Sequence, residues 1–140
     1  MLDHLAAIRS LELPRGSYVV IGGSCLAVRG IRESNDIDMV VTQKLFKEMQ
    51  NKGWPIDEPF RQKWNRVRLK REPFEIFTDI YLERSKQFIP ADQLIKSAEL
   101  IEDIPFLPIR DILFYKTDNP RQKDIVDIAL IADYLRSNQT

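Results

Sequence analysis

The sequence predicts one α/β (α+β) domain in which a mixed, twisted sheet is flanked by helices. A hydrophobic strand at 19–21 runs into a pair of glycines, and a second extended run at 35–41 alternates acidic with apolar residues. Segments with helical spacing of apolar residues separate and follow these strands. A chain of 140 residues buries roughly 70% of its unfolded surface, which suits one core and a single domain spanning 1–140.

The first half of the chain alternates helix and strand. Leu2, Leu5 and Ile8 recur at helical spacing before Pro14, and the glycines after the first strand are followed by a second apolar helical segment. The expected elements are a helix at 2–11, a strand at 19–21, a helix through 26–28, a strand at 35–41, a helix at 43–51 and a loop at 54–62.

The second half predicts a hairpin and then two closing helices. The turn of the hairpin falls at 71–73, and Pro108 precedes the first closing helix. Asn119 as N-cap and Pro120 at the first helical position begin the last helix, whose apolar stripe consists of Ile125, Ile128, Ala129, Ala132 and Leu135. The remaining elements are strands at 65–70 and 74–82, a helix at 91–98, extended pieces at 100–104 and 106–107, and a helix at 109–116.

Two carboxylates occupy alternate positions in the second strand. Successive side chains on a strand point to opposite faces, so Asp36 and Asp38 project together while Ile37 and Met39 face the core. Like charges about 4 Å apart cost on the order of 4 kcal/mol at an effective dielectric of about 20. The pair is therefore expected to share a proton or to hold a cation, and oxygen ligands favour Mg²⁺ or Mn²⁺.

The turn after the first strand suits a phosphate group. Gly22 and Gly23 allow a sharp bend and a close approach of the backbone to a ligand, and Ser24 can cap the next helix. Free amide groups at a helix N-terminus attract anions. Either motif alone has an ordinary structural explanation, and their order along the chain is what favours a phosphate and metal site.

The composition limits which cellular compartment and which binding partners are expected. The 21 basic and 21 acidic residues balance, so any nucleic-acid binding must come from a local patch. Cys25 is the single cysteine, which excludes an internal disulfide, and His4 is the single histidine, which excludes a histidine-based metal site or triad. With neither a signal peptide nor a long apolar segment, the expectation is a cytoplasmic protein without membrane contact.

The order Ile21-Gly22-Gly23-Ser24 followed by Asp36-Ile37-Asp38 resembles the nucleotidyltransferase superfamily typified by DNA polymerase beta. Within it, the chain is similar to the minimal branch of AbiEii-toxin-like proteins, which also tend to carry Arg and Ser or Thr ahead of the acidic pair, as Arg32 and Ser34 do here. The resemblance implies the nucleotidyltransferase fold, an NTP substrate, Mg²⁺ or Mn²⁺ as cofactor, and a role in a toxin–antitoxin system with a protein partner encoded nearby.

The resemblance also implies a third carboxylate on a neighbouring strand, beside Asp36 and Asp38. Glu75 stands in the expected hydrophobic setting, and Asp79 is its rival because residues four apart on a strand share a face. Glu75 is favoured, although the family usually has Asp there.

A lysine and a charged signature on the last two helices line the nucleotide site in AbiEii-like proteins. Lys116 and the run Arg121, Lys123, Asp124 and Asp127 match that layout. The alternative is purely structural, with Lys123 and Asp127 forming an i,i+4 ion pair near the helix N-terminus.

Basic residues alternate along the strand expected at 65–70, namely Arg66, Arg68 and Lys70. They are interpreted either as the solvated face of an edge strand or as a surface that receives a triphosphate or a nucleic-acid backbone such as tRNA. No aromatic residue alternates with them to support base stacking.

The expected activity is transfer of an NMP from an NTP to a hydroxyl acceptor in RNA, a protein or a small molecule. Asp36, Asp38 and Glu75 are the expected catalytic and metal-binding residues. Gly22, Gly23, Ser24, Arg32, Lys116, Lys123 and Asp124 are the expected nucleotide- and phosphate-binding residues. The alternative is a non-catalytic nucleotide-binding or regulatory module, such as an antitoxin-like or degenerate nucleotidyltransferase.

Overall fold

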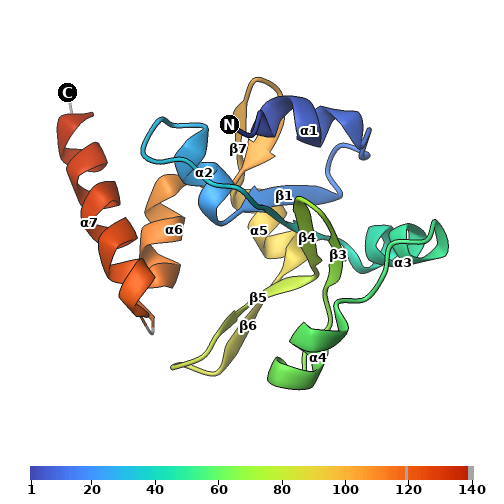
Figure 1. Cartoon of the computed structure of the whole chain (residues 1–140). Coiled ribbons are helices and arrows are strands. Elements are labelled where there is room, and N and C mark those ends of the chain that lie inside the picture. Colours follow the sequence, from blue (N-terminus) through green and yellow to red (C-terminus); the bar gives the residue numbers. More distant parts are fainter. Residues whose placement is uncertain (119, 139–140) are drawn as a thin grey trace.

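The computed structural model of the chain describes residues 1–118 and 120–138. Along these residues the chain forms eight strands and seven helices (Figure 1). The strands are β1 (Tyr18–Ile21), β2 (Ile37–Val41), β3 (Leu69–Arg71), β4 (Phe74–Phe77), β5 (Asp79–Leu82), β6 (Gln87–Pro90), β7 (Glu99–Ile101) and β8 (Ile104–Phe106). The helices are α1 (His4–Ser10), α2 (Gly23–Ala27), α3 (Gln43–Asn51), α4 (Glu58–Trp64), α5 (Ala91–Ser97), α6 (Ile109–Lys116) and α7 (Gln122–Ser137).

Six of the strands form one mixed sheet in the order β3-β4-β2-β1-β8-β7, and β5 pairs with β6 in a separate two-stranded sheet. β2 runs antiparallel to β1 and parallel to β4, while β8 runs parallel to β1. The predicted α+β architecture with a mixed sheet and flanking helices is therefore confirmed at this level.

The core lies around the two central strands. Val19 and Val20 of β1 and Met39 and Val40 of β2 are fully buried, and α2 and α5 pack against both strands. α6 contacts α2 and carries α7 on its other side, so α7 lies at the edge of the molecule (Figure 1). The central strands thus hold the glycine turn and the acidic strand in a rigid frame.

The expected loop at 54–62 is wrong in its second part, because α4 begins at Glu58. Asp57 caps this helix by accepting the Phe60 N–H at 3.2 Å. Pro59 lies in the first turn, where the missing N–H has no intrahelical partner to lose. The proline that suggested a loop is therefore compatible with a helix start.

The expected strands at 65–70 and 74–82 are also corrected. β3 begins only at Leu69, and the second run is divided at Thr78 into β4 of the main sheet and β5 of the small sheet. β5 leaves the main sheet because it pairs with β6, with Asp79 opposite Pro90. This pairing partner lies too far along the chain for a local pattern to reveal it.

The last helix begins later than expected and is turned differently about its axis. Arg121 is the N-cap of α7, and the Asp124 carboxylate accepts the Arg121 backbone N–H at 3.0 Å. Pro120 precedes this cap, and Asn119 lies outside the described residues. Ile125 of the expected apolar stripe is 54% exposed, whereas Asp124 and Asp127 are buried. In its first turns, the side of α7 that faces the rest of the protein therefore carries Asp124 and Asp127.

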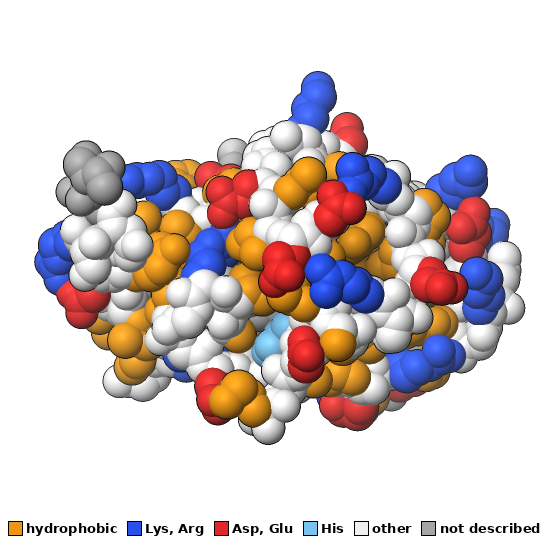
Figure 2. Space-filling model, turned by 90° about the horizontal axis from the view of Figure 1, so that it is seen from above, with side chains coloured by type: hydrophobic (Ala, Val, Ile, Leu, Met, Phe, Trp, Pro, Cys, Tyr) orange, Lys and Arg blue, Asp and Glu red, His pale blue; other side chains and the backbone are white. Residues whose placement is uncertain are grey.

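On the face shown in Figure 2, basic and acidic side chains are interspersed, as the balanced composition suggests. In the described part of the chain, none of the helices combines the length and the apolar character that crossing a bilayer requires.

Candidate functional site

Strand register brings the acidic strand beside the glycine turn and beside Glu75. Asp38 of β2 lies opposite Ile21 of β1 on one side and opposite Glu75 of β4 on the other. Because Ile21 is the last residue of β1, the turn that starts at Gly22 lies next to Asp38. Ile37 and Met39 are fully buried, as the alternation predicted, and Asp36 lies one residue before the strand begins.

The turn requires glycine at two successive positions. Gly22 has a φ of +68°, and a Cβ atom there would lie 2.8 Å from Asp38 Oδ2. A Cβ atom on Gly23 would lie 2.5 Å from Ser34 Oγ. Real Cβ atoms do not come so close to their neighbours, so only glycine allows the backbone to approach the acidic strand.

A cavity of about 320 Å³ joins the two motifs. Gly23 of the turn and both Asp36 and Asp38 line it, as do the cationic side chains of Arg32 and Lys123. The remaining lining residues are Glu33, Ser34 and Asn35. Residues that the sequence motifs place 15 positions apart, from Gly23 to Asp38, thus border one polar cavity.

Asp38 is the most perturbed carboxyl group of this cavity. Its Oδ1 atom is buried and has no hydrogen-bond partner. Burial, the charge and hydrogen bonding of Glu75, and the charge of Asp36 raise the pKa of Asp38 to about 8, against a smaller lowering by Arg68. The ionised form of Asp38 therefore lacks a compensating cation in the described structure, which favours either a bound proton or a bound cation.

Glu75 and Asp79, the two expected rivals for a third carboxylate, have separate environments. Glu75 lies beside Asp38, and its Oε2 accepts from Arg68 at 3.1 Å. Asp79 belongs to the small sheet and binds Arg66 at 2.7 Å. The expectation that both acids share the face of one strand is wrong, since the chain changes sheets between them.

Ser24 lies behind the turn instead of facing the cavity. Its side chain is fully buried, and its Oγ lies 2.8 Å from His4 Nδ1. His4 Nε2 lies 2.9 Å from the Ser34 carbonyl oxygen. A carbonyl can only accept, so His4 Nε2 carries a proton. Ser24 Oγ also lies 3.3 Å from the Asp36 carbonyl oxygen. The hydroxyl of Ser24 is therefore engaged by His4 and by the Asp36 carbonyl, and only its backbone remains for a phosphate group.

The sequence pattern did not predict this role of His4. Its only local sign is that a polar side chain occupies the apolar face of α1. His4 is 7% exposed and joins α1 to the phosphate turn and to the loop that carries Ser34.

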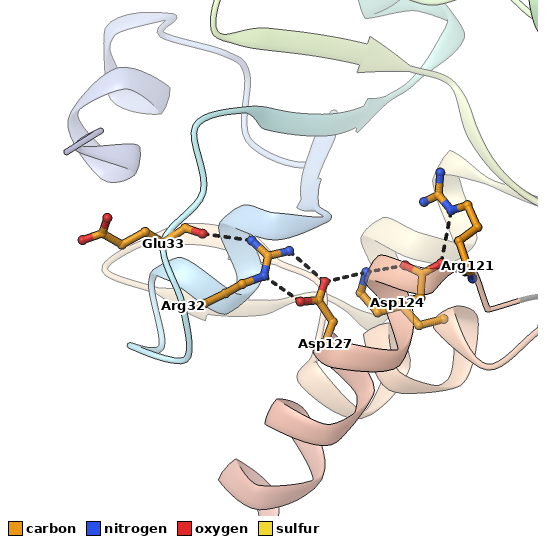
Figure 3. A network of polar contacts seen from close by, with 6 residues as sticks. Arg32, Glu33, Arg121, Asp124 and Asp127 are labelled. Carbon is orange, nitrogen blue, oxygen red and sulfur yellow. Dashed lines mark hydrogen bonds and ion pairs between the residues drawn. The ribbon is translucent and has the colours of Figure 1, made fainter.

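Buried acids of α7 bind two of the expected phosphate-binding cations. Arg32 donates to both oxygens of Asp127, at 2.7 and 2.8 Å. Lys116 lies 3.1 Å from both Asp124 and Asp127. Arg121 binds Asp124 from the outer side, and Figure 3 shows the two aspartates pointing from α7 toward their partners. This arrangement, named here the α7 ion network, neutralises Arg32 and Lys116.

The α7 ion network sets the charge state of its acids. The hydrogen bonds from Arg32 are the largest influence on Asp127, and with Lys116 they lower its pKa against the opposing effect of burial. Burial opposes ionisation of Asp124 too, but Arg121 and Lys116 lower its pKa. The expected i,i+4 pair of Lys123 with Asp127 is wrong, because Asp127 binds Arg32 and Lys116 while Lys123 lines the cavity.

The expected basic stripe is likewise paired internally. Arg66 binds Asp79, and Arg68 binds both Asp57 and Glu75. Lys70 lies 3.5 Å from Glu72 and 4.0 Å from Glu75. These side chains do not line one face of a strand, since Arg66 and Arg68 precede β3.

The residues present suit a hard divalent cation in their chemistry. Among the described residues, no group of three or more His, Cys, Asp or Glu side chains is arranged as a metal site. Asp36 and Asp38 nevertheless offer carboxylate oxygens to one cavity, and Asp38 Oδ1 has no other partner. Carboxylates are the protein ligands of Mg²⁺, which keeps several water molecules and uses few protein groups. The donor set fits such an ion.

Comparison with protein-family models, with curated proteins and with solved structures gives no match to this chain.

Proposed function

We propose that the chain is a divalent-metal-dependent nucleotidyltransferase, which moves an NMP from an NTP to a hydroxyl acceptor and releases pyrophosphate. The observation that carries the proposal is the shared cavity of Gly23, Asp36 and Asp38, in which a buried oxygen of Asp38 lacks a partner. The resemblance of the two motifs to the AbiEii-like branch supports this proposal, which includes a role in a toxin–antitoxin system.

Asp36 and Asp38 would hold Mg²⁺ or Mn²⁺, and Glu75 would complete the acidic group from the neighbouring strand. A bound divalent ion supplies charge stabilisation for the phosphates and lowers the pKa of an oxygen that it binds. The proposal explains why β2 places Asp38 against Glu75 although their repulsion opposes folding. Repulsion of this kind is retained where a site needs it for a cation.

The triphosphate would lie along the turn and the cationic wall of the cavity. Gly22 and Gly23 bring the turn against Asp38 and Ser34, and the N-cap Gly22 makes no side-chain hydrogen bond to the start of α2. α2 has only five residues, so its dipole adds little and the charged side chains matter more. Lys123 lines the cavity and is exposed, which makes it the first candidate to contact phosphate oxygens.

Phosphoryl chemistry demands positioning and charge stabilisation more than covalent participation by the protein. The cavity is lined by both signs of charge, with Asp36 and Asp38 as acids and Arg32 and Lys123 as cations, and of these cations Arg32 is paired with Asp127. This combination of charges suits a negatively charged triphosphate that arrives with a divalent cation.

A transfer assay tests the proposal. The purified chain is incubated with each α-labelled NTP, Mg²⁺ or Mn²⁺, and separately total RNA, protein lysate or small-molecule acceptors. We expect label in one acceptor class, and we expect Asp38→Asn to reduce transfer at least 100-fold while the variant stays folded. Full transfer by Asp38→Asn would contradict the assignment. Lys44→Gln, at an exposed position of α3, is a matched control that should leave transfer unchanged.

A non-catalytic nucleotide-binding or regulatory module is the second candidate. The α7 ion network favours it, because Asp127 already neutralises Arg32 and Lys116. Such a module would show a metal-dependent thermal shift with NTP and no transfer of label to any acceptor.

A further inference from the structure

Aromatic rings from three separate elements, α4, β4 and β5, surround the two arginines that precede β3. The Arg66 guanidinium carbon lies 5.9 Å from the ring centroids of Phe60 and Phe77 and 5.5 Å from that of Tyr81. Arg68 lies 4.1 Å from the Phe60 centroid. Tyr81 contacts Phe88 of β6, with centroids 4.6 Å apart. These residues are named here the arginine–aromatic cluster.

Two rings at the border of the cluster face solvent. Trp64 stands one helical turn after Phe60 on α4 and is 47% exposed, and Phe88 on the β5–β6 hairpin is 57% exposed. The Lys63 ammonium lies 5.2 Å from the Trp64 ring centroid. Large exposed rings in a monomer are informative when they accompany cations, because flat aromatic faces and positive charge together match unpaired bases and phosphates.

The charge around the cluster favours an anionic ligand. Arg66 and Arg68 are paired with carboxylates, so they shape the cluster without adding net charge. Among the described residues, Lys63 and Lys86 have no carboxylate within ion-pair distance. Residues 57–88 contain 8 Lys or Arg and 6 Asp or Glu, which gives a net charge of +2 in a chain whose total is zero.

The cluster adjoins the candidate site. Arg68 contacts Phe60 on one side and donates to Glu75 on the other, and Glu75 lies opposite Asp38. The β5–β6 hairpin also reaches the segment between α6 and α7, because the Arg84 backbone N–H donates to Asp118 at 2.9 Å. The hairpin and α4 both extend from the lower side of the sheet in Figure 1. Arg68 thus links the cluster to the neighbouring carboxyl groups of Glu75 and Asp38.

We propose that the surface formed by Trp64, Phe88, Lys63 and Lys86 binds a single-stranded nucleic acid, with bases against the two rings and phosphates near the two lysines. This interface adds the class of acceptor to the proposed function. Only the role of the bound strand as acceptor rests on that function; the binding itself does not. Arg66 and Arg68, the cations that the sequence suggested for this task, instead hold the rings in place.

Binding is measured without transfer, on the full chain in EDTA. Fluorescence anisotropy with labelled 12-nucleotide oligo(U) RNA and oligo(T) DNA gives affinities at several salt concentrations. Stacking on an aromatic side chain contributes about 1–3 kcal/mol per base, so Trp64→Ala and Phe88→Ala should each weaken binding at least five-fold. Phe114→Ala is the matched control, because Phe114 is 66% exposed but lies on α6.

The lysines are tested by charge reversal and salt dependence. Lys63→Glu and Lys86→Glu should weaken binding and flatten the dependence of log affinity on log salt, since each removed phosphate contact lowers that slope by about 0.7 for a single strand. Lys47→Glu on α3 is the control. Circular dichroism and thermal melts confirm that each variant is folded.

Preference for RNA, preference for DNA, or equal binding would each support the proposal and would identify the strand. No binding to either oligonucleotide at low salt would overturn it, as would equal weakening by Phe114→Ala and Phe88→Ala. Oligonucleotide binding without NMP transfer in the assay above would contradict the proposed function while leaving this interface intact.

Discussion

Asp38 and Glu75 lie opposite each other on the neighbouring parallel strands β2 and β4, and the buried Oδ1 atom of Asp38 has no hydrogen-bond partner. A fold that places two carboxyl groups together at the centre of its sheet is destabilised by their ionisation. The arrangement is therefore informative about function, because Arg68 binds Glu75 whereas the buried Oδ1 atom of Asp38 is left without a partner.

Asp38→Asn should stabilise the metal-free protein. Burial, Glu75 and Asp36 raise the pKa of Asp38 to about 8, so the folded state binds a proton more tightly than the unfolded state does. The stability of the wild type then falls as the pH rises from about 4 to about 8. The melting temperature of Asp38→Asn in EDTA should exceed that of the wild type at pH 8–9 by several degrees, and the difference should vanish near pH 4.

The matched control for this prediction is Asp36→Asn, because Asp36 is exposed and lies before the strand. It should change the melting temperature much less. An Asp38→Asn variant that melts below the wild type at pH 8–9 would show that the carboxylate stabilises the fold.

Gly22→Ala should be more destabilising than Gly16→Ala. Both glycines have positive φ angles, +68° and +83°, so both substitutions carry a backbone cost of roughly 1–3 kcal/mol. The new Cβ atom at position 22 would also lie 2.8 Å from Asp38 Oδ2, whereas that at position 16 meets nothing within 4 Å. Urea denaturation should show an additional loss of about 1–2 kcal/mol for Gly22→Ala. Equal losses would mean that the turn is not packed against Asp38.

Asp127→Asn should destabilise the protein by about 2–4 kcal/mol at pH 7, because it leaves the partly buried Arg32 and Lys116 without their shared partner. Asp133→Asn is the control, since its ion pair with Arg136 is exposed and such pairs contribute about 0–1 kcal/mol. Urea denaturation measures both variants.

The same substitution should change the acid sensitivity of the fold. Arg32 and Lys116 lower the pKa of Asp127 below the ordinary value of 3.8. The stabilisation by Asp127 is therefore present above about pH 4 and is lost as the pH falls through its lower, folded-state pKa. The gap between wild type and Asp127→Asn should shrink below pH 4, and a gap that stays constant to pH 2 would contradict this role.

Cys25 should react with iodoacetamide only when the chain opens. Its side chain is fully buried, and burial raises the pKa of the thiol to about 12. The thiolate is the reactive form, so native labelling at pH 8 should be at least 100-fold slower than labelling in denaturant. Fast native labelling would contradict the packing of α2 against β1.

Local patterns were sufficient where the relevant contacts are local. The alternation around Asp38 predicted that Ile37 and Met39 are buried, and the glycine pair predicted a sharp turn, which lies against Asp38. The order of these motifs was enough to predict that Gly23 and Asp38 share one cavity.

Contacts between distant parts of the chain determine the features that local sequence patterns did not predict. The Ser24 hydroxyl bonds to His4, which lies 20 residues away in the sequence. Asp127 faces the protein from α7 because it binds Arg32, which lies 95 residues away. The choice between Glu75 and Asp79 depended on a change of sheet at Thr78, which follows from pairing of β5 with β6. No periodicity within a single segment carries this information.

The most direct test of the central claim is a crystal structure of the protein with Mn²⁺ and a non-hydrolysable NTP analogue, using anomalous scattering to locate the metal. We expect an ion bound by Asp36 and Asp38, with the triphosphate along Gly22 and Gly23. A triphosphate bound elsewhere, or an Asp38 that remains protonated against Glu75 with no ion at saturating Mn²⁺, would contradict it.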